Sequence, residues 1–173
     1  MENKRASQLV FDGQEKKATA IIIRQIYCGQ HGQFKSALQF LFHYFHFKRL
    51  RKTEVAEKIL SIAVCEMEHL DRLGDYLEDK YLNASGLTFE GKFWNFLERC
   101  DSDNLIKMLL DDVVLNCIMI REYERVEEKI KERQGLELIK RIILDEKKHL
   151  KILSELLKKE GGNLSLSTCK GAR

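Results

Sequence analysis

The same short pattern occurs twice in this sequence: a glutamate, a histidine three residues later, and then a leucine. Glu66 and His69 form the first copy, and Glu146 and His149 form the second, 80 residues further on. Residues three positions apart on a helix point in the same direction, so the carboxylate and the imidazole of each copy can converge on one ion. Imidazole and carboxylate ligands together suit iron, manganese or zinc better than calcium. The pattern therefore indicates a transition-metal site.

Both copies fall on the apolar side of a helix. In the first, Ile59, Ile62 and Leu73 continue the stripe of Glu66 and His69 at intervals of three and four residues. An unpaired carboxylate is costly to bury, and a bound cation removes that cost by supplying the missing charge. One such pattern on a charged helix is a common accident. Two copies on equivalent apolar stripes favour metal binding.

Four segments carry the helical periodicity that must position these residues. They span residues 15–47, 54–78, 104–132 and 136–159, with short turns near 49–53 and 133–135. Short turns join antiparallel helices, and the long segment 82–104 can cross from one hairpin to the other. The sequence thus predicts an all-α, antiparallel four-helix bundle, two helical hairpins joined by a long crossover, over residues 15–160. Residues 1–14 are predicted as an N-terminal tail and 161–173 as a flexible C-terminal tail.

Composition limits the other possibilities. The chain has 173 residues, enough for one domain with a sizeable core, and contains no proline. A net charge of +3 argues against a nucleic-acid surface, and the most apolar run, ALQFLFHYFHF, has only 11 residues, too few to cross a membrane. Five cysteines, an odd number without a C-x-x-C pair, are predicted to be reduced thiols. These features predict a cytoplasmic protein whose partner is a metal ion.

The phrases VCEMEHLDRLGDYL and RIILDEKKHLKILSELL resemble those of the ferritin-like superfamily, most closely its rubrerythrin and manganese-catalase-like branch. The resemblance extends from Tyr27 to Leu156. It implies a ferritin-like four-helix bundle in which a further glutamate on each preceding helix joins each glutamate–histidine pair, so that the six side chains hold two metal ions. It also implies iron or manganese as the cofactor, peroxidase- or catalase-like oxidoreductase chemistry, and a homodimer or larger homo-oligomer.

The two further glutamates of that pattern are replaced by amides in this chain. The phrase YCGQHGQFKSALQF resembles the family's first-helix phrase, and its glutamate position is Gln33, 33 residues before Glu66. The matching position on the third helix, 30 residues before Glu146, is Asn116. Hairpin geometry supports both placements, because a turn near residue 50 puts position 33 level with 66, and a turn near 131 puts 116 level with 146.

Charge then decides how many ions fit. The family's four carboxylates balance two divalent ions, whereas Glu66 and Glu146 alone carry a formal −2, which balances one. Two interpretations remain open. The chain binds one transition-metal ion, iron or manganese or else zinc, through Glu66, His69, Glu146 and His149, and acts in peroxide, oxygen or iron handling. Alternatively, it is a metal-free pseudo-enzyme that serves as a structural or assembly bundle. Whether it is an enzyme stays undecided.

Several neighbours are candidate auxiliary groups around these ligands. Asp112, one turn from Asn116, is predicted to orient His149 or to add a carboxylate to the site. Asp145 resembles the family position that hydrogen-bonds a metal-bound histidine, and its counterpart in the other copy is Cys65. Cys65, like the other cysteines near this level, is predicted to be a small apolar residue rather than a ligand. Tyr123 fits either a hydrogen-bonded phenol beside the site or a core aromatic.

Overall fold

A computed structural model describes residues 2–29, 31–79, 88–89, 92–93 and 104–163, with the side chains of 13–29, 31–79 and 104–163. These residues form five α-helices and one antiparallel pair of two-residue strands. The elements are α1 (Glu2–Cys28), α2 (Gln33–Arg49), α3 (Thr53–Asp79), β1 (Thr88–Phe89), β2 (Lys92–Phe93), α4 (Leu105–Lys129) and α5 (Arg133–Lys159). Thr88 pairs with Phe93, and Phe89 with Lys92.

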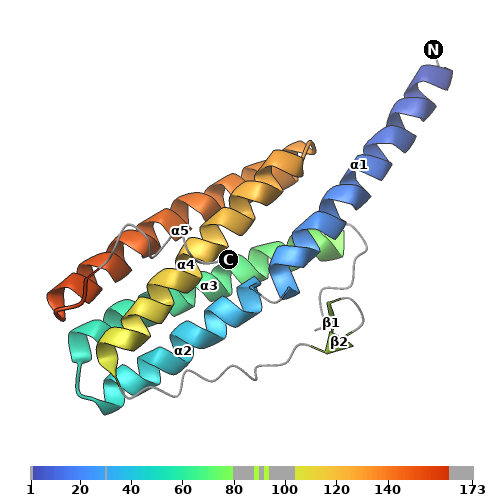
Figure 1. Ribbon diagram of the computed structural model, residues 1–173. Helices are drawn as coiled ribbons and strands as arrows, with labels where there is room; N and C mark the ends of the chain where they lie inside the picture. The colour runs from blue at the N-terminus through green and yellow to red at the C-terminus, as the bar shows by residue number, and fades with distance from the viewer. Residues whose placement is uncertain (1, 30, 80–87, 90–91, 94–103, 164–173) are drawn as a thin grey trace.

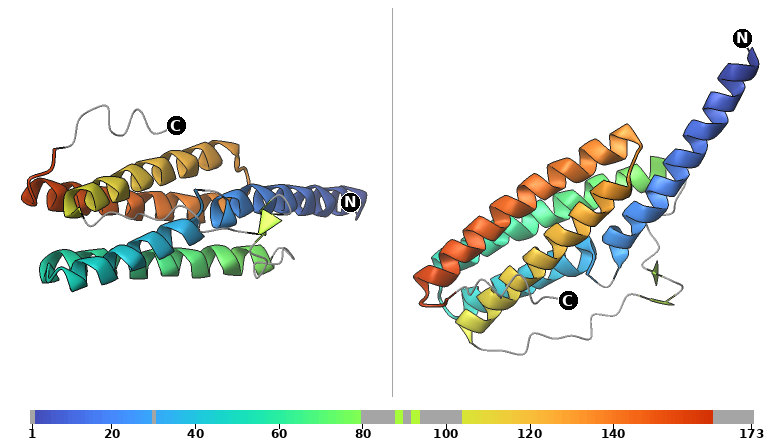
Figure 2. Two further views of the ribbon diagram at one scale, coloured as in Figure 1. Left: turned by 60° about the horizontal axis from the view of Figure 1, so that its bottom comes forward. Right: turned by 45° about the horizontal axis from the view of Figure 1, so that its top comes forward.

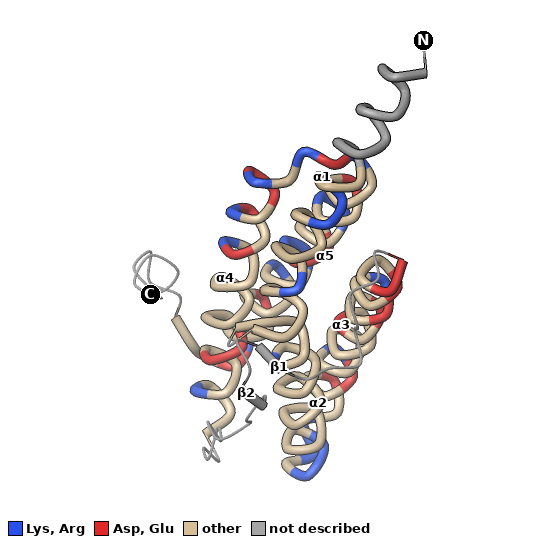
Figure 3. Tube along the Cα trace, turned by 90° about the vertical axis from the view of Figure 1, so that its right-hand side faces the viewer, with Lys and Arg blue, Asp and Glu red and all other residues tan. Residues whose placement is uncertain are grey.

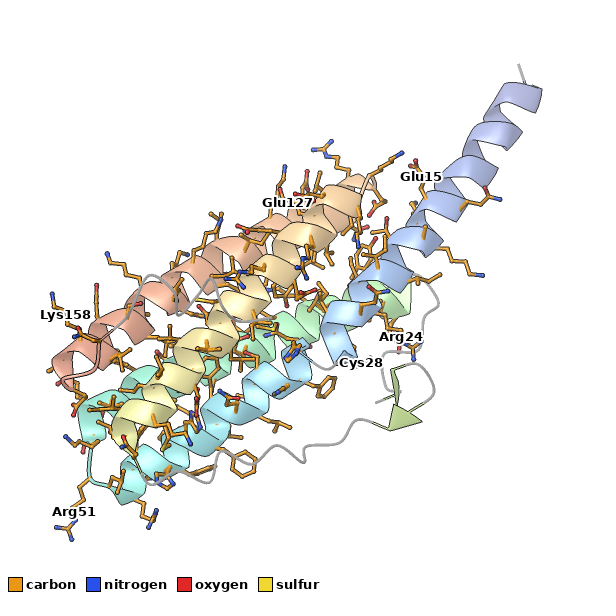
Figure 4. All side chains as sticks on the ribbon, in the orientation of Figure 1. Glu15, Arg24, Cys28, Arg51, Glu127 and Lys158 are labelled. Carbon is orange, nitrogen blue, oxygen red and sulfur yellow. The ribbon has the colours of Figure 1, made fainter. Side chains whose placement is uncertain are left out.

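Two antiparallel hairpins make up the bundle. Helices α2 and α3 form one, α4 and α5 form the other, and the two pack face to face (Figures 1 and 2). Arg51 lies at the turn of the first hairpin, at the same end of the bundle as Lys158, whereas Glu127 lies toward the other end (Figure 4). The prediction of an all-α bundle of two helical hairpins is therefore confirmed. The connection between the hairpins contains β1 and β2, and most of it lies outside the described residues.

The predicted first helix, residues 15–47, is wrong because the chain breaks there into α1 and α2. Cys28 marks the end of α1, and the N-terminal half of α1 projects past the end of the bundle (Figures 1 and 4). At the break, the Gly29 amide still bonds to the Gln25 carbonyl oxygen at 2.9 Å, but the Gly32 amide bonds to the Gly29 carbonyl oxygen at 2.9 Å. A Cβ on Gly32 would lie 2.8 Å from the Gly29 nitrogen and 2.9 Å from the Ile26 oxygen. Glycine is thus required for this close approach.

Two other predicted boundaries need correction. Helix α1 begins at Glu2, so residues 2–14 are helical rather than a tail; they contain no proline and mostly good helix formers. Helix α5 begins at Arg133, within the predicted turn, because the Glu132 carboxylate caps it by accepting from the amides of Gln134 and Gly135 at 3.0 and 2.7 Å. The predicted flexible tail lies mostly outside the described residues.

Two apolar clusters fill the interior and leave a polar layer between them. One cluster includes Leu73, Tyr123 and Ile139, and the other includes Ile59, Leu109 and Leu153. On α3 and on α5, the residues of the two glutamate–histidine patterns lie in sequence between members of the two clusters. The clusters therefore close the polar layer at both ends along the bundle axis and shield it from water.

Charged residues of both signs occur along the outer faces of α3, α4 and α5 (Figure 3). Among the described helices, none combines the length and the apolar character that a membrane crossing needs. Cys28 and Cys65 are reduced thiols, as predicted, but Cys117 is disulfide-bonded, which corrects the prediction for that residue. Sequence spacing alone does not show which cysteines a fold brings together.

The break between α1 and α2 leads to a stability prediction. We expect Gly32→Ala to lower the free energy of unfolding by about 1–3 kcal/mol, the usual cost of forcing extra atoms into a packed site. A matched control is Gly13→Ala, since a Cβ there meets nothing within 4 Å and alanine favours a helix by up to about 1 kcal/mol. Urea unfolding of both variants measures the difference. Equal stability of the two would contradict the close approach at Gly32.

Candidate metal centre

The four residues of the repeated pattern meet in the polar layer of the bundle. Glu66 and His69 come from α3, and Glu146 and His149 come from α5. The first three are fully buried, and His149 is 5% exposed. The structure thus brings together, away from water, all four residues that the sequence indicated as ligands.

The imidazole of each glutamate–histidine pair lies close to the carboxylates of both helices. The Nδ1 atom of His149 lies 3.0 Å from Oε1 of Glu66, across the bundle, and 3.6 Å from Oε2 of Glu146 on its own helix. The Nδ1 atom of His69 lies 3.4 Å from Oε1 of Glu146 and 3.6 Å from Oε2 of Glu66. The two rings are tilted by 35°, with centroids 6.0 Å apart. Each histidine therefore faces both carboxylates through the same ring nitrogen.

Two of these donor atoms lack a hydrogen-bond partner among the described residues, although both are buried. They are Nδ1 of His69 and Oε1 of Glu146. Their separation of 3.4 Å is long for a hydrogen bond. Two ligands bound about 2.1 Å from one tetrahedral ion lie about 3.4 Å apart, so the spacing suits one shared cation. The chemistry and the spacing of the donor set therefore fit a single divalent metal ion.

Gln33, at the start of α2, is turned so that its amide nitrogen faces the site. That nitrogen donates to Oε2 of Glu66 and, at 3.2 Å, to the Glu66 carbonyl oxygen. The amide oxygen accepts from the Tyr123 hydroxyl. Burial, together with the charges of Glu146 and Glu66, raises the pKa of this phenol well above its ordinary value, so it remains a donor. Tyr123 is thus a hydrogen-bonded phenol beside the site, and it sets the orientation of the Gln33 amide.

Asn116, on α4, donates a hydrogen bond to the carboxylate of Glu146, as Gln33 does to that of Glu66. Its amide nitrogen donates to Oε2 of Glu146 at 2.6 Å, and its buried oxygen has no partner among the described residues. Both amide positions inferred from hairpin register therefore lie against the glutamates expected from the sequence. In this arrangement each amide donates a hydrogen bond to a buried carboxylate.

Mutual attraction sets the charges of the buried groups. Burial alone would raise the pKa of Glu66, but its hydrogen bond with His149 and the nearby positive charge of His69 hold the value well below normal. Burial alone would lower the pKa of His69 and of His149, but the adjacent carboxylates of Glu146 and Glu66 raise each to about 10. At neutral pH, without a metal ion, both imidazoles therefore carry a proton. Their two positive charges balance the two carboxylates, as the charge of one divalent ion would.

The structure pairs Asp112 with a residue that the sequence did not link to the site. Its Oδ1 atom lies 2.7 Å from Nδ1 of His43 and accepts from Nε2 of Gln39 at 3.0 Å. The predicted contact with His149 is not among the described contacts. Both partners come from α2, which packs against α4, whereas the prediction considered only the level of Asp112 along the bundle. His43 and Asp112 are both buried, so each neutralises the other.

Asp145 and Cys65 lie on the outer side of His69. Oδ2 of Asp145 and Sγ of Cys65 are each 3.6 Å from Nε2 of His69, the ring nitrogen that faces away from the carboxylates. Asp145 thus lies beside His69, but the 3.6 Å separation is longer than the hydrogen bond that the family resemblance implied. Cys65 was predicted to be a plain apolar residue, and its contact with His69 was missed.

The rubrerythrin family model matches residues 40–157, well over half of the sequence and most of both hairpins. The chain belongs to the rubrerythrin family. The resemblance inferred from the sequence motifs is therefore confirmed. No curated protein matches the sequence.

Solved structures of other ferritin-like proteins share the rubrerythrin-type fold of this chain. A manganese catalase from Anabaena PCC7120 matches with a TM-score of 0.71 and 14% sequence identity, over 87% of this chain and 78% of the catalase. The bacterioferritin of Desulfovibrio desulfuricans, which has a diiron site, matches with a TM-score of 0.70 and 15% identity, over 93% of this chain and 90% of the bacterioferritin. At this level of identity the likeness shows a shared ferritin-like fold.

The charges of the metal-free centre predict how stability depends on pH. Both histidines have a folded-state pKa of about 10, above the ordinary value of 6.5. Their contribution to the free energy of unfolding is therefore complete below pH 6.5 and is lost as the pH rises toward 10. The pKa of Glu66 is lowered, so its contribution is complete above 4.5 and is lost at lower pH. Chelator-treated protein should unfold at lower urea concentration at about pH 9 than at about pH 6.

A histidine variant and its control make that test specific. Replacing His69 and His149 together with glutamine should flatten the pH dependence above neutrality, because the buried imidazoles cause it. Replacing His46, which lies outside the site on α2, with glutamine should leave the dependence unchanged. Stability of the metal-free protein that increases from about pH 6 to about pH 9 would contradict the proposed protonation state.

Proposed function

We propose that this member of the rubrerythrin family is a metal-binding protein that holds one divalent transition-metal ion through Glu66, His69, Glu146 and His149. The observation that carries the proposal is the pair of buried, unpartnered donor atoms, Nδ1 of His69 and Oε1 of Glu146, at the spacing of two ligands on one ion. The Nδ1 atom of His149 and the carboxylate of Glu66 complete the set.

The charge of the centre supports one ion rather than two. With neutral imidazoles, the two carboxylates give −2, which one divalent ion balances. Gln33 and Asn116 add no charge, and their nitrogens donate to the carboxylates instead of presenting further oxygens to a second ion. A second ion in the same buried layer would leave two positive charges uncompensated, which is costly.

Iron or manganese is the expected metal, and zinc also suits these ligands. A bound iron or manganese supplies redox chemistry. The chain's own groups fix the ligands, since Tyr123 orients Gln33 and Gln33 holds the carboxylate of Glu66. The structural relative from Anabaena is a manganese catalase, so peroxide is the first substrate to test on the loaded protein. The cytoplasmic location and the homo-oligomer stay predictions.

A metal-free structural bundle is the second candidate, and one observation favours it. Each buried carboxylate already accepts a hydrogen bond from an amide, Glu66 from Gln33 and Glu146 from Asn116. With two imidazolium groups beside them, the buried charges balance without an ion. This candidate predicts a stability that does not respond to chelators.

Metal content decides between the two candidates. We expect one ion per chain after anaerobic loading with iron or manganese, measured by elemental analysis. His149→Ala should lower the affinity at least tenfold, because it removes a ligand, whereas His46→Ala should not change it. The loaded protein should melt at higher temperature than the chelated one, because a ligand bound only by the folded state stabilises it. Absence of bound metal under every loading condition would leave the structural bundle.

Restoring the family's carboxylates tests the charge argument directly. The double variant Gln33→Glu, Asn116→Glu should raise the capacity from one ion to two per chain, because its four carboxylates balance two divalent ions. Without metal, the variant should be less stable than the parent, since two additional carboxylates lie in the same buried layer. The matched control is Gln39→Glu, which adds a carboxylate on α2 beside Asp112 and not beside Glu66. Two iron or manganese ions bound by the buried layer of the unmodified chain, and retained in a Cys65→Ser variant, would overturn the one-ion proposal.

A further inference from the structure

The ring of His69 has polar groups on both sides. Its Nδ1 atom faces the carboxylates of Glu66 and Glu146 in the buried layer. Its Nε2 atom faces outward, toward Cys65 and Asp145. A neutral imidazole has one lone pair, which can bind an ion on either side depending on which nitrogen carries the hydrogen. The Nε2 atom on the outer side can therefore bind an ion when the hydrogen is on Nδ1.

Three different metal-ligating atoms converge on that outer side. Sγ of Cys65 and Oδ2 of Asp145 each lie 3.6 Å from Nε2 of His69, and the three atoms lie within 4.8 Å of one another. A thiolate and an imidazole nitrogen on one tetrahedral zinc ion, at about 2.3 and 2.1 Å, are about 3.6 Å apart. The distance from Asp145 to the ring is too long for a good hydrogen bond. Sγ of Cys65 is within hydrogen-bonding distance of the ring for a sulfur atom, and the same spacing of the three atoms suits a shared cation that would replace this hydrogen bond.

The backbone holds Cys65 and Asp145 at the rim of the bundle, beside the buried ring of His69. Cys65 and His69 are one turn apart on α3, and Asp145 comes from the facing helix α5. Cys65 is partly exposed and the side chain of Asp145 is 23% exposed, so an ion from solvent can reach them. Lys148 binds the other oxygen of Asp145, Oδ1, at 2.8 Å and leaves Oδ2 directed at the ring. The positive charge of Lys148 lies on the solvent side and is exposed.

We propose that Cys65, His69 and Asp145 form a second divalent-cation site, on the outer side of the His69 ring that it shares with the buried site. A thiolate, an imidazole and a carboxylate are ligands for zinc or cobalt rather than for calcium or magnesium. The thiolate and the carboxylate carry −2 together, which balances one divalent ion. Three protein ligands leave a fourth position for water or a small molecule, as in zinc sites that are open to solvent.

This site rests on the proposed function only through His69. When His69 turns its lone pair outward, Glu66, Glu146 and His149 remain together on the inside, with donor atoms within 4.8 Å of one another. The chain can thus offer three ligands to an ion on each side of the ring. The failure of one site can be distinguished from the failure of the other, because their remaining ligands differ.

Cobalt(II) is a direct probe, because thiolate ligation produces a charge-transfer band in the near ultraviolet that nitrogen and oxygen ligands do not produce. We expect the full chain, kept anaerobic, to develop this band on cobalt titration and to lose it when zinc is added. Cys65→Ser should abolish the band. Asp145→Asn should weaken cobalt binding at this site by about tenfold or more. Far-ultraviolet circular dichroism checks that each variant keeps its helices.

Two controls make the result decisive. Cys28→Ser removes the other reduced thiol among the described residues and should leave the band intact. Glu146→Gln removes an inner carboxylate and should also leave it intact, even where it abolishes iron or manganese binding, so the two proposals can fail independently. Absence of the band in the unmodified chain at saturating cobalt, or its survival in Cys65→Ser, would overturn this second site.

Discussion

The structure depends on how two buried glutamates are neutralised. Glu66 and Glu146 lie fully out of water between two apolar clusters, where an isolated carboxylate would be prohibitively costly. Positive charge must therefore reach them from within the bundle, from the imidazoles of His69 and His149, or from an ion. Two amides and a phenol at this level take part in that balance. Gln33 and Asn116 donate hydrogen bonds to the carboxylates, and Tyr123 keeps the Gln33 amide turned in the required direction.

The helix break adjoins the first of these amides. Gln33 is the first residue of α2, directly after Gly32, so the chain direction at the break also sets where the Gln33 side chain begins. Its amide can reach Glu66 on α3 and Tyr123 on α4 together. The close contact of Gly32 with the end of α1 is thus connected to the polar layer through Gln33. This connection explains why glycine is needed at position 32, which helix periodicity does not reveal.

Periodicity and register predicted much of this arrangement. Spacing of three and four residues identified the buried faces of α3 and α5, and hairpin symmetry located Gln33 and Asn116 opposite the glutamates. Both rules depend on backbone repeats, which a sequence displays directly. The contacts that were missed depend on which helices pack side by side and how far a side chain reaches. Asp112 contacts His43 on α2 rather than His149, and Cys65 contacts His69 on its own helix. Cys117 is disulfide-bonded. The break at Gly32 was missed because an apolar stripe continues across it.

Amides rather than carboxylates at positions 33 and 116 determine which charges the centre has to balance. In the metal-free state two protons on His69 and His149 balance two carboxylates. In the proposed metal-bound state one divalent ion would replace those two protons. The net charge of the buried layer is equal in both states, so the bundle need not repack to pass between them. Four carboxylates with two histidines could not be balanced by imidazole protons alone. The amides therefore leave the metal-free buried layer electrically neutral, and the same −2 charge would limit the proposed inner site to one ion. A further cation would need other negative groups, such as Cys65 and Asp145 on the outer side of His69.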